Sequence, residues 1–197
     1  MKRCLWTGED QIYIDYHDNE WGVPEYNSHA LFEKLILDGF QAGLSWLTIL
    51  KKRDNFRKAF NGFDPKGLST WRSEQVDLLL QNSGIIRHRG KIEATINNAK
   101  IFLQIEEREG FNNFLWKYVR WKPLINRWTD SGEIPAYSEL SVKISTDLRE
   151  LGFKFCGPTI VYAFMQATGM INDHLVSCPC FQKCQDNSQP FPFVKNK

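Results

Sequence analysis

Apolar residues recur at helical spacing along most of this chain, whereas the alternation of apolar and polar residues that is typical of strands is scarce. The clearest apolar face lies between residues 90 and 107, at Ile92, Ile96, Ala99 and Leu103. Because these residues are three or four positions apart, they share one side of a helix and can pack against a core. The chain has no internal repeat and no low-complexity linker, so the sequence predicts an all-α fold.

Capping residues and glycines place the other expected helices. Asn27 or Ser28 can cap a helix that Gly39 and Gly43 interrupt, and Ser45 can cap the next one. The ranges expected to be helical are about 27–39, 46–60, a short piece from 64, 74–81, 90–107, 111–119, 138–151 and 158–168. Residues 121–134 contain several breakers and are expected to form a loop.

Composition limits the domain organisation and leaves the partner open. The chain has 197 residues, 42% of them apolar, which is enough for one domain with a sizeable core. We expect residues 1–184 to form a single domain with two lobes and residues 185–197, rich in Gln, Asn and Pro, to form a poorly ordered tail. The formal net charge of +2 does not by itself indicate a nucleic-acid partner.

The N-terminal segment has no apolar stretch of signal-peptide length, and no later segment approaches the length of a membrane span. We therefore expect a cytoplasmic protein that makes no membrane contact. The five cysteines would then be reduced, and metal ligation is a more usual role for them than disulfide pairing.

Four residues with soft or borderline donor atoms lie near the two ends of the chain. Cys4 and His17 are near one end, and His174 and Cys178, in the pattern His-x-x-x-Cys, are near the other. Two Cys and two His satisfy a tetrahedral Zn²⁺ and leave no open position, so such a site would be structural and would pin the ends together. Alternatives remain open: Cys4 as an incidental small hydrophobe, His17 as a surface residue, and Cys180 as a rival to Cys178.

The segment 151–159 joins two expected helices and has glycines on either side of a short apolar run. Glycines let the backbone approach a ligand closely, and a helix that begins with Pro presents free N–H groups to an anion. The segment therefore suits a phosphate of a DNA backbone. The candidate contacts are Gly152, Lys154, Gly157 and Thr159. An ordinary helix–helix turn explains the same residues equally well, and segment 84–92 is similar in kind.

Aromatic residues and one carboxylate form the candidate substrate-binding set: Trp6, Tyr13, Tyr16, Trp21, Asp38 and Trp46. Asp38 interrupts an apolar stretch, and a buried carboxylate is costly unless it is paired or has a task. Aromatic faces with one carboxylate can bind a flat cationic base through stacking, cation–π attraction and hydrogen bonds from its N–H groups. The alternative is a helix-end Asp that caps its own backbone.

Several segments resemble the bacterial 3-methyladenine DNA glycosylase I family: YHDNEWGVP from residue 16, QAGLSW from 41, GIIRHRGKI from 84, GFKF from 152 and NDH from 172. The likeness runs from Cys4 to about Cys178, nearly the whole chain. It implies the helix-hairpin-helix DNA glycosylase superfamily, with the hairpin at about residues 151–159. It also implies one structural Zn²⁺ with four ligands, which are Cys4, His17, His174 and Cys178.

The resemblance further implies a base pocket between the two lobes. Tyr16 and Trp46 contact the excised base in this interpretation, whereas Trp6 stacks on it and Trp21 lines the cavity. The carboxylate position falls on Asp38, where the family has Glu, which is one methylene longer. The pocket is then slightly remodelled, or a water molecule bridges the gap. Asp38 and Tyr16 are the candidate catalytic residues.

A second departure concerns the superfamily's catalytic Asp, which follows the hairpin in many members. Asn172 occupies the matching position here, and Asp173 is one residue out of register. We expect Asp173 to support the ligand His174 instead. The resemblance therefore suggests catalysis without that carboxylate.

The sequence thus predicts a base-excision repair glycosylase that acts on double-stranded alkylated DNA. It would hydrolyse the N-glycosidic bond of 3-methyladenine as a monofunctional, monomeric enzyme and leave an abasic site. The methylated base is already cationic and leaves without protonation, so the enzyme has to flip the nucleotide and bind the leaving base in the transition state. The alternatives are a non-catalytic protein that binds alkylation damage and a glycosylase for another alkylated purine.

Overall fold

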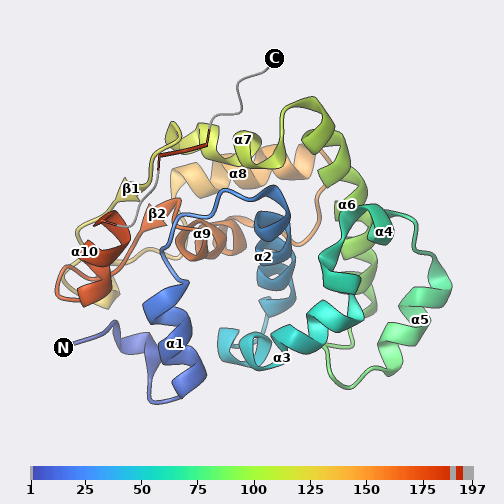
Figure 1. The fold of residues 1–197 in the computed structure, drawn as a ribbon, viewed down its shortest axis with the longest axis horizontal. Coiled ribbons are helices and arrows are strands. Elements are labelled where there is room, and N and C mark those ends of the chain that lie inside the picture. Colours follow the sequence, from blue (N-terminus) through green and yellow to red (C-terminus); the bar gives the residue numbers. More distant parts are fainter. Residues whose placement is uncertain (1, 187–189, 193–197) are drawn as a thin grey trace.

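The computed structural model describes residues 2–186 and 190–192, and this part of the chain is mostly helical, as predicted (Figure 1). The α-helices are α1 (Gln11–Asn19), α2 (Ser28–Gln41), α3 (Trp46–Ala59), α4 (Pro65–Ser69), α5 (Ser73–Gln81), α6 (Arg89–Arg108), α7 (Phe111–Trp116), α8 (Glu139–Glu150), α9 (Pro158–Ala167) and α10 (Pro179–Asp186). Short 3₁₀ helices lie at Leu5–Thr7, Asn61–Phe63, Lys117–Val119 and Ser131–Glu133. The strands are β1 (Leu124–Ile125) and β2 (Ile171–Asn172).

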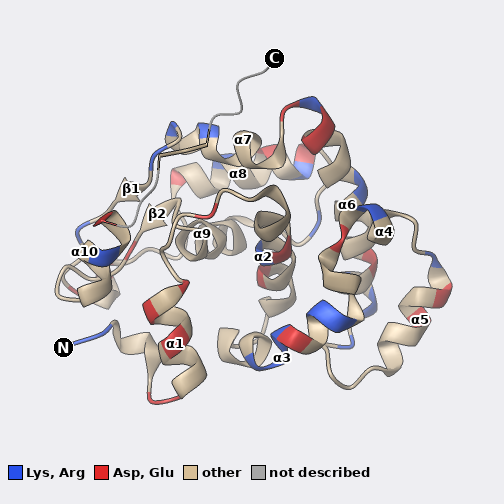
Figure 2. Ribbon diagram, in the orientation of Figure 1, with Lys and Arg blue, Asp and Glu red and all other residues tan. Residues whose placement is uncertain are grey.

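Helix α2 lies at the centre of the fold and packs against α3, α6, α7 and α9 (Figure 1). Helices α3 to α6 lie on one side of it, and α1, α10 and the two strands lie on the other. Helix α9 carries no charged residue (Figure 2), and its side chains Val161, Phe164 and Met165 are fully buried. Helices α2 and α9 therefore form one packed wall of the candidate site.

The expected caps explain where the central helices begin. The Asn27 side chain accepts a hydrogen bond from the Ala30 backbone N–H at 3.0 Å, and Ser45 accepts one from Thr48 at 3.2 Å. Gly43 has a φ of +83° and lies in the turn between α2 and α3, as expected.

The expectation that Gly39 interrupts the first of these helices is wrong, because α2 continues to Gln41. A Cβ atom at position 39 would lie 3.1 Å from the Phe155 carbonyl oxygen. Gly39 is therefore a point of close approach, where the turn between α8 and α9 packs onto α2, and it does not break the helix.

The chain around the predicted loop 121–134 contains two short regular elements. Strand β1 pairs in parallel with β2, with Leu124 opposite Ile171, and a 3₁₀ helix follows at 131–133. The pairing brings this loop beside the segment that leads to His174. None of the helices in the described ranges is both long and apolar enough to cross a lipid bilayer.

Two helices have no counterpart in the sequence prediction. Helix α1 carries aromatic and polar residues without a regular apolar stripe, and α10 lies among the C-terminal cysteines. The predicted tail, residues 185–197, begins inside α10. Phe191 is buried against Tyr26 and Trp116, whereas residues 187–189 and 193–197 of that tail lie outside the described residues.

Candidate functional site

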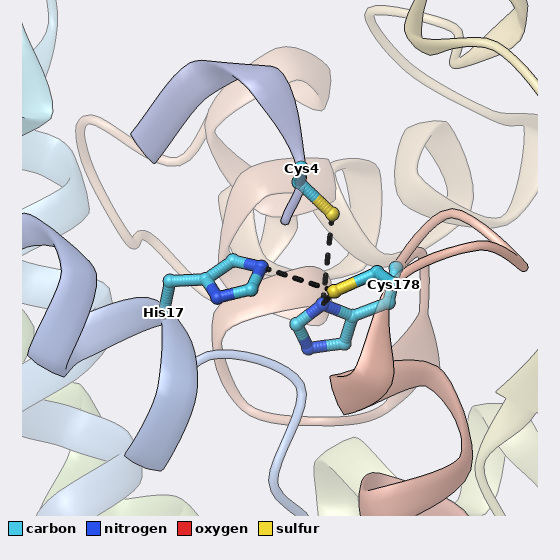
Figure 3. Close-up of side chains that lie close together, drawn as sticks. Cys4, His17 and Cys178 are labelled. Atoms are coloured by element: carbon cyan, nitrogen blue, oxygen red, sulfur yellow. Dashed lines mark hydrogen bonds between the residues drawn. The ribbon is translucent and has the colours of Figure 1, made fainter. Parts of the chain in front are cut away.

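The four predicted metal ligands converge where the N-terminal segment meets the segment between β2 and α10. Cys4 lies just before the first 3₁₀ helix and His17 on α1, whereas His174 and Cys178 come from the segment between β2 and α10. Figure 3 shows the side chains of Cys4, His17 and Cys178 pointing toward one another. All four residues are buried, and one donor atom of each lies within 4.8 Å of the others.

The distances in this cluster suit a tetrahedral zinc ion. The Cys178 sulfur lies 3.6 Å from His17 Nε2 and 3.7 Å from His174 Nδ1, and the Cys4 sulfur lies 3.7 Å from His174 Nδ1. Zinc bonds of about 2.3 Å to sulfur and about 2.05 Å to nitrogen place each such pair about 3.6 Å apart in a tetrahedron. The donor set and its spacing can therefore hold a metal ion.

The second nitrogen of each imidazole is engaged in a way that leaves the first free for a metal. His17 Nδ1 donates to the Asp18 carboxylate at 2.7 Å, and His174 Nε2 donates to the Trp21 carbonyl oxygen at 3.0 Å. These hydrogen bonds fix the tautomers, so His17 Nε2 and His174 Nδ1 carry lone pairs toward the sulfurs. Arg3 in turn holds Asp18 with hydrogen bonds of 2.8 to 3.0 Å.

Cys180, the rival ligand, lies on the other side of the His17 ring. Its sulfur is 3.9 Å from His17 Nδ1 and 3.8 Å from Asp18 Oδ1, and burial raises the pKa of its thiol to about 12. Cys178 lies instead beside Cys4, whose hydrogen bond holds the pKa of the Cys178 thiol well below its usual value, and its sulfur lies 3.6 and 3.7 Å from the free nitrogens of the two histidines. Cys178 is therefore the better donor.

Asp173 does not support His174, contrary to the expectation from sequence. Its fully buried carboxylate accepts four hydrogen bonds, each of 2.7 or 2.8 Å, from Asn126, Trp128, Tyr162 and Gln166. Trp21 holds the His174 ring instead. Asp173 therefore ties the loop after β1 to α9.

The six predicted substrate-binding residues all line one cavity of about 380 Å³. Trp6, Tyr13, Tyr16 and Trp21 come from the N-terminal segment, Asp38 from α2 and Trp46 from α3. Sequence reasoning missed the rest of the lining, which consists of Gln41, Ser131, Ile134, Ala163, Gln166 and Ala167. Three of these lie on one face of α9, but their side chains are too ordinary in sequence to indicate a pocket.

The aromatic walls of the cavity rest on the metal-ligand cluster. The Trp6 ring centroid lies 4.9 Å from that of Tyr13, 5.0 Å from that of Trp21 and 5.2 Å from that of His17. The Trp21 ring meets His174 edge to face at 4.6 Å. His17 and His174 contact the Trp6 and Trp21 rings, so a ligand that fixes these histidines also positions the aromatic wall of the cavity.

Asp38 is the one carboxylate in the cavity, and it is buried within α2. Its Oδ2 atom has no hydrogen-bond partner among the described residues, and the same is true of Trp46 Nε1. Burial raises the pKa of Asp38 from 3.8 to about 8, and the charge of Lys34 opposes part of this rise. The capping alternative does not hold, since α2 continues past Asp38 and this oxygen binds no backbone group.

Tyr16 lies opposite Trp46 with ring centroids 5.5 Å apart. Complete burial raises the pKa of Tyr16 well above its ordinary value, so its hydroxyl is neutral at any physiological pH. Tyr16, Asp38 and Trp46 also line a second cavity of about 290 Å³, together with Lys34. The Lys34 ammonium donates to the Ala167 carbonyl oxygen at 3.2 Å and so links α2 to α9.

The candidate DNA contacts lie in the turn between α8 and α9. Gly152 has a φ of +99°, Gly157 caps α9 and Pro158 begins it, whereas Lys154 and Thr159 are exposed. The turn is clamped by Asn98 on α6, whose amide donates to the Lys154 carbonyl oxygen and accepts from its N–H, both at 2.9 Å. Asn98 was missed because it lies off the apolar stripe of its helix.

Comparison with known proteins gives a consistent result. Residues 6–182 match the family model described as methyladenine glycosylase. The DNA-3-methyladenine glycosylase of Haemophilus influenzae is 50% identical over 179 residues, which cover 90% of this chain and 97% of that protein. DNA-3-methyladenine glycosylase 1 of Escherichia coli is 50% identical over 182 residues, 92% of this chain and 97% of that protein.

Solved structures agree in fold over nearly the same span. A crystal structure of 3-methyladenine DNA glycosylase I superposes with a TM-score of 0.90 at 49% identity and covers 91% of this chain and 99% of its own. A tyrosine-to-phenylalanine variant of 3-methyladenine DNA glycosylase I, in complex with 3-methyladenine, superposes with a TM-score of 0.88 at 38% identity and covers 91% of this chain and 97% of its own.

Proposed function

Since this chain belongs to the methyladenine glycosylase family, we infer that it is a DNA-3-methyladenine glycosylase, a hydrolase that cleaves the N-glycosidic bond of 3-methyladenine in alkylated DNA. The observation that carries this conclusion is the cavity of about 380 Å³, which combines an aromatic cage with one buried carboxylate. A flipped cationic base fits this chemistry, because the rings can stack on it and the carboxylate can accept its N–H groups.

We propose distinct roles for the cavity residues. Tyr16 and Trp46 flank the flipped base, and Trp6 stacks on it. Trp21 and Tyr13 complete the cage. Asp38 accepts a hydrogen bond from the base and places negative charge beside it as positive charge spreads to the sugar in the transition state.

The base leaves without an enzymatic general acid or a covalent intermediate in this proposal. Asn172, at the superfamily's carboxylate position, accepts from the His174 backbone N–H and donates to the Phe181 carbonyl oxygen. The Asn172 amide therefore ties the segment at His174 to α10 and is not free to take part in catalysis. No lysine lines the base cavity among the described residues, which favours a monofunctional enzyme that leaves an abasic site.

We further propose that Cys4, His17, His174 and Cys178 hold one structural Zn²⁺. The sulfur and nitrogen spacing fits the ion, and the four buried ligands leave no position for substrate. When bound, the ion would lock the N-terminal segment to the segment between β2 and α10. The ligand histidines would in turn support the cavity wall, because His17 packs against Trp6 and His174 against Trp21. Residues 1–184 would then act as one monomeric glycosylase domain with two lobes around the pocket.

The turn between α8 and α9 is proposed to bind a phosphate of double-stranded DNA through Gly152, Lys154, Gly157 and Thr159. Lys154 has no ion-pair partner in the described ranges, so Lys154→Gln should weaken DNA binding several-fold at low salt. The logarithm of the DNA-binding constant falls linearly with the logarithm of the salt concentration, and the substitution should make this slope less steep by about 0.9. Fluorescence anisotropy at several salt concentrations measures both.

The matched control for this prediction is Lys143→Gln, because Lys143 on α8 is already paired with Asp147 at 2.6 Å. This control should leave the salt slope unchanged. Equal slopes for wild type and Lys154→Gln would show that Lys154 contacts no phosphate.

The first test of the function is chromatography of free bases released from methylated DNA by the purified protein. We expect selective release of 3-methyladenine and no DNA adduct after borohydride treatment. Release of a different alkylated purine would reassign the substrate. DNA binding without release, with activity gained in Asp38→Glu, would identify a damage-binding protein instead.

A further inference from the structure

Gln166 is a polar residue of the base cavity that the proposed roles do not use. It lies on α9, where it lines the cavity together with Ala163 and Ala167. Asp38 reaches the same cavity from α2, the helix packed beside α9. The bond from Lys34 to the Ala167 carbonyl oxygen holds the two helices in register at this level.

Asp173 determines which atom of the Gln166 amide faces the cavity. Gln166 Nε2 donates to Asp173 Oδ2 at 2.7 Å. A carboxylate only accepts hydrogen bonds, so the NH₂ group must face Asp173 and the amide oxygen must point away from it. Asp173 is itself held at both carboxylate oxygens, because Tyr162 donates to the same oxygen and Trp128 to the other.

The Gln166 amide oxygen has no hydrogen-bond partner in the part of the chain that the structure describes, and it is not among the fully buried polar atoms that lack one. It is therefore open to the cavity that the residue lines. Asp38 and Gln166 thus each bring an acceptor to the cavity from neighbouring helices. An acceptor whose orientation is fixed in advance binds a donor without further ordering of the side chain.

We propose that Gln166, oriented by Asp173, is a specificity-determining residue that accepts a hydrogen bond from the exocyclic amine of the flipped base. This proposal rests on the function given above. An exocyclic amine has two N–H groups, so it can donate to the Asp38 carboxylate and to the Gln166 amide oxygen together. A purine with a carbonyl oxygen in place of the exocyclic amine would set that oxygen against the oxygens of Asp38 and Gln166. These acceptors would then stay unpaired, so the pocket would reject such a purine.

Gln166→Met tests the proposal, because methionine keeps the length of the side chain and removes the amide. The probes are free 3-methyladenine and free 3-methylguanine, with binding followed by tryptophan fluorescence. We expect the variant to bind 3-methyladenine about tenfold more weakly and to lose most of its preference for it over 3-methylguanine. Wild type should prefer 3-methyladenine strongly.

Tyr162→Phe is the matched control, because it removes another donor to the same Asp173 oxygen from a buried residue that does not line the cavity. It should retain both the affinity and the preference. An unchanged Gln166→Met variant would overturn the proposal. So would equal losses in the two variants, because the effect would then come from the hydrogen bonds around Asp173.

Asp173→Asn gives a second and sharper test. Trp128 can only donate, so it would select the amide oxygen of the new Asn and turn its NH₂ group toward Tyr162 and Gln166. The Gln166 amide would then flip and present a donor to the cavity. The preference should move toward 3-methylguanine, and an unchanged preference in this folded variant would contradict the proposal.

These measurements separate the inference from the proposed function. Wild-type protein that binds free 3-methyladenine but releases none from methylated DNA would refute the activity. Wild-type protein that releases the base, with a Gln166→Met variant that discriminates equally well, would refute only the role of Gln166.

Discussion

Asp38→Asn is expected to lower kcat/KM for base release by at least about 100-fold while it makes the folded protein more stable at alkaline pH. The loss of activity follows because the variant keeps the shape of the side chain but removes the negative charge beside a cationic base. The gain in stability follows because Asp38 is buried and its Oδ2 atom has no hydrogen-bond partner in the described structure. Charge in such a position is costly to the folded state.

The pH dependence follows from the raised pKa of this carboxyl group. Burial raises it from 3.8 to about 8, so the folded protein holds a proton that the unfolded chain has released between these values. Stability of the wild type therefore falls as the pH rises from about 4 to about 8, by a few kcal/mol, and levels off above. The Asn variant lacks this fall, so the two stability curves should separate progressively across that range.

Urea unfolding at pH 5 and pH 9 measures the stability difference, and single-turnover base release measures the activity. For wild type, kcat/KM should rise with pH up to about 8, where Asp38 becomes ionised in the free enzyme. Asp38→Glu is the control that keeps the charge, and it should retain activity. An Asn variant as active as wild type would remove Asp38 from the mechanism.

Cys178→Ala is expected to abolish metal binding and to lower the stability of the protein by at least about 3 kcal/mol, or roughly 10 °C in Tm. The Cys178 sulfur lies close to a nitrogen of both histidines, at 3.6 Å from His17 and 3.7 Å from His174, so its loss removes a ligand from the centre of the cluster. Wild-type protein should contain about one equivalent of zinc, and a strong chelator should reproduce the fall in Tm.

Two other buried cysteines serve as controls for this prediction. Cys156 lies in the turn between α8 and α9, away from the cluster, and Cys180 lies on the far side of the His17 ring. Cys156→Ala and Cys180→Ala should both keep the metal, as measured by inductively coupled plasma mass spectrometry. Metal retained by Cys178→Ala but lost from Cys180→Ala would make Cys180 the ligand. Less than half an equivalent in folded wild type would argue against the site.

Much of the fold was predictable because its determinants are local. The caps Asn27 and Ser45 and the helical spacing of apolar residues act within a few positions, and the helices begin where these residues place them. Helix α1 was not predictable in this way. It has no regular apolar stripe, and its buried residues pack against distant segments, Tyr16 against Trp46 of α3 and His17 against Cys178 and His174.

The residue types of the site were visible in the sequence, and the resemblance to a known family indicated how they group. Two Cys and two His near the chain ends, and one carboxylate among aromatic residues, lie together in the structure as that grouping requires. The sequence determined this much because donor type and ring chemistry belong to each residue by itself.

Only the tertiary structure decided which partner each polar group takes. In the fold, the Asp173 carboxylate accepts hydrogen bonds from Gln166 and Tyr162, whereas His174 donates to the Trp21 carbonyl oxygen. Gly39, expected to break a helix, lies within α2 instead and allows the Phe155 carbonyl oxygen to approach closely. These outcomes depend on segments that are far apart in the chain and meet only in the packed core. Burial there makes an unpaired polar group costly, and sequence spacing does not determine which partner it finds.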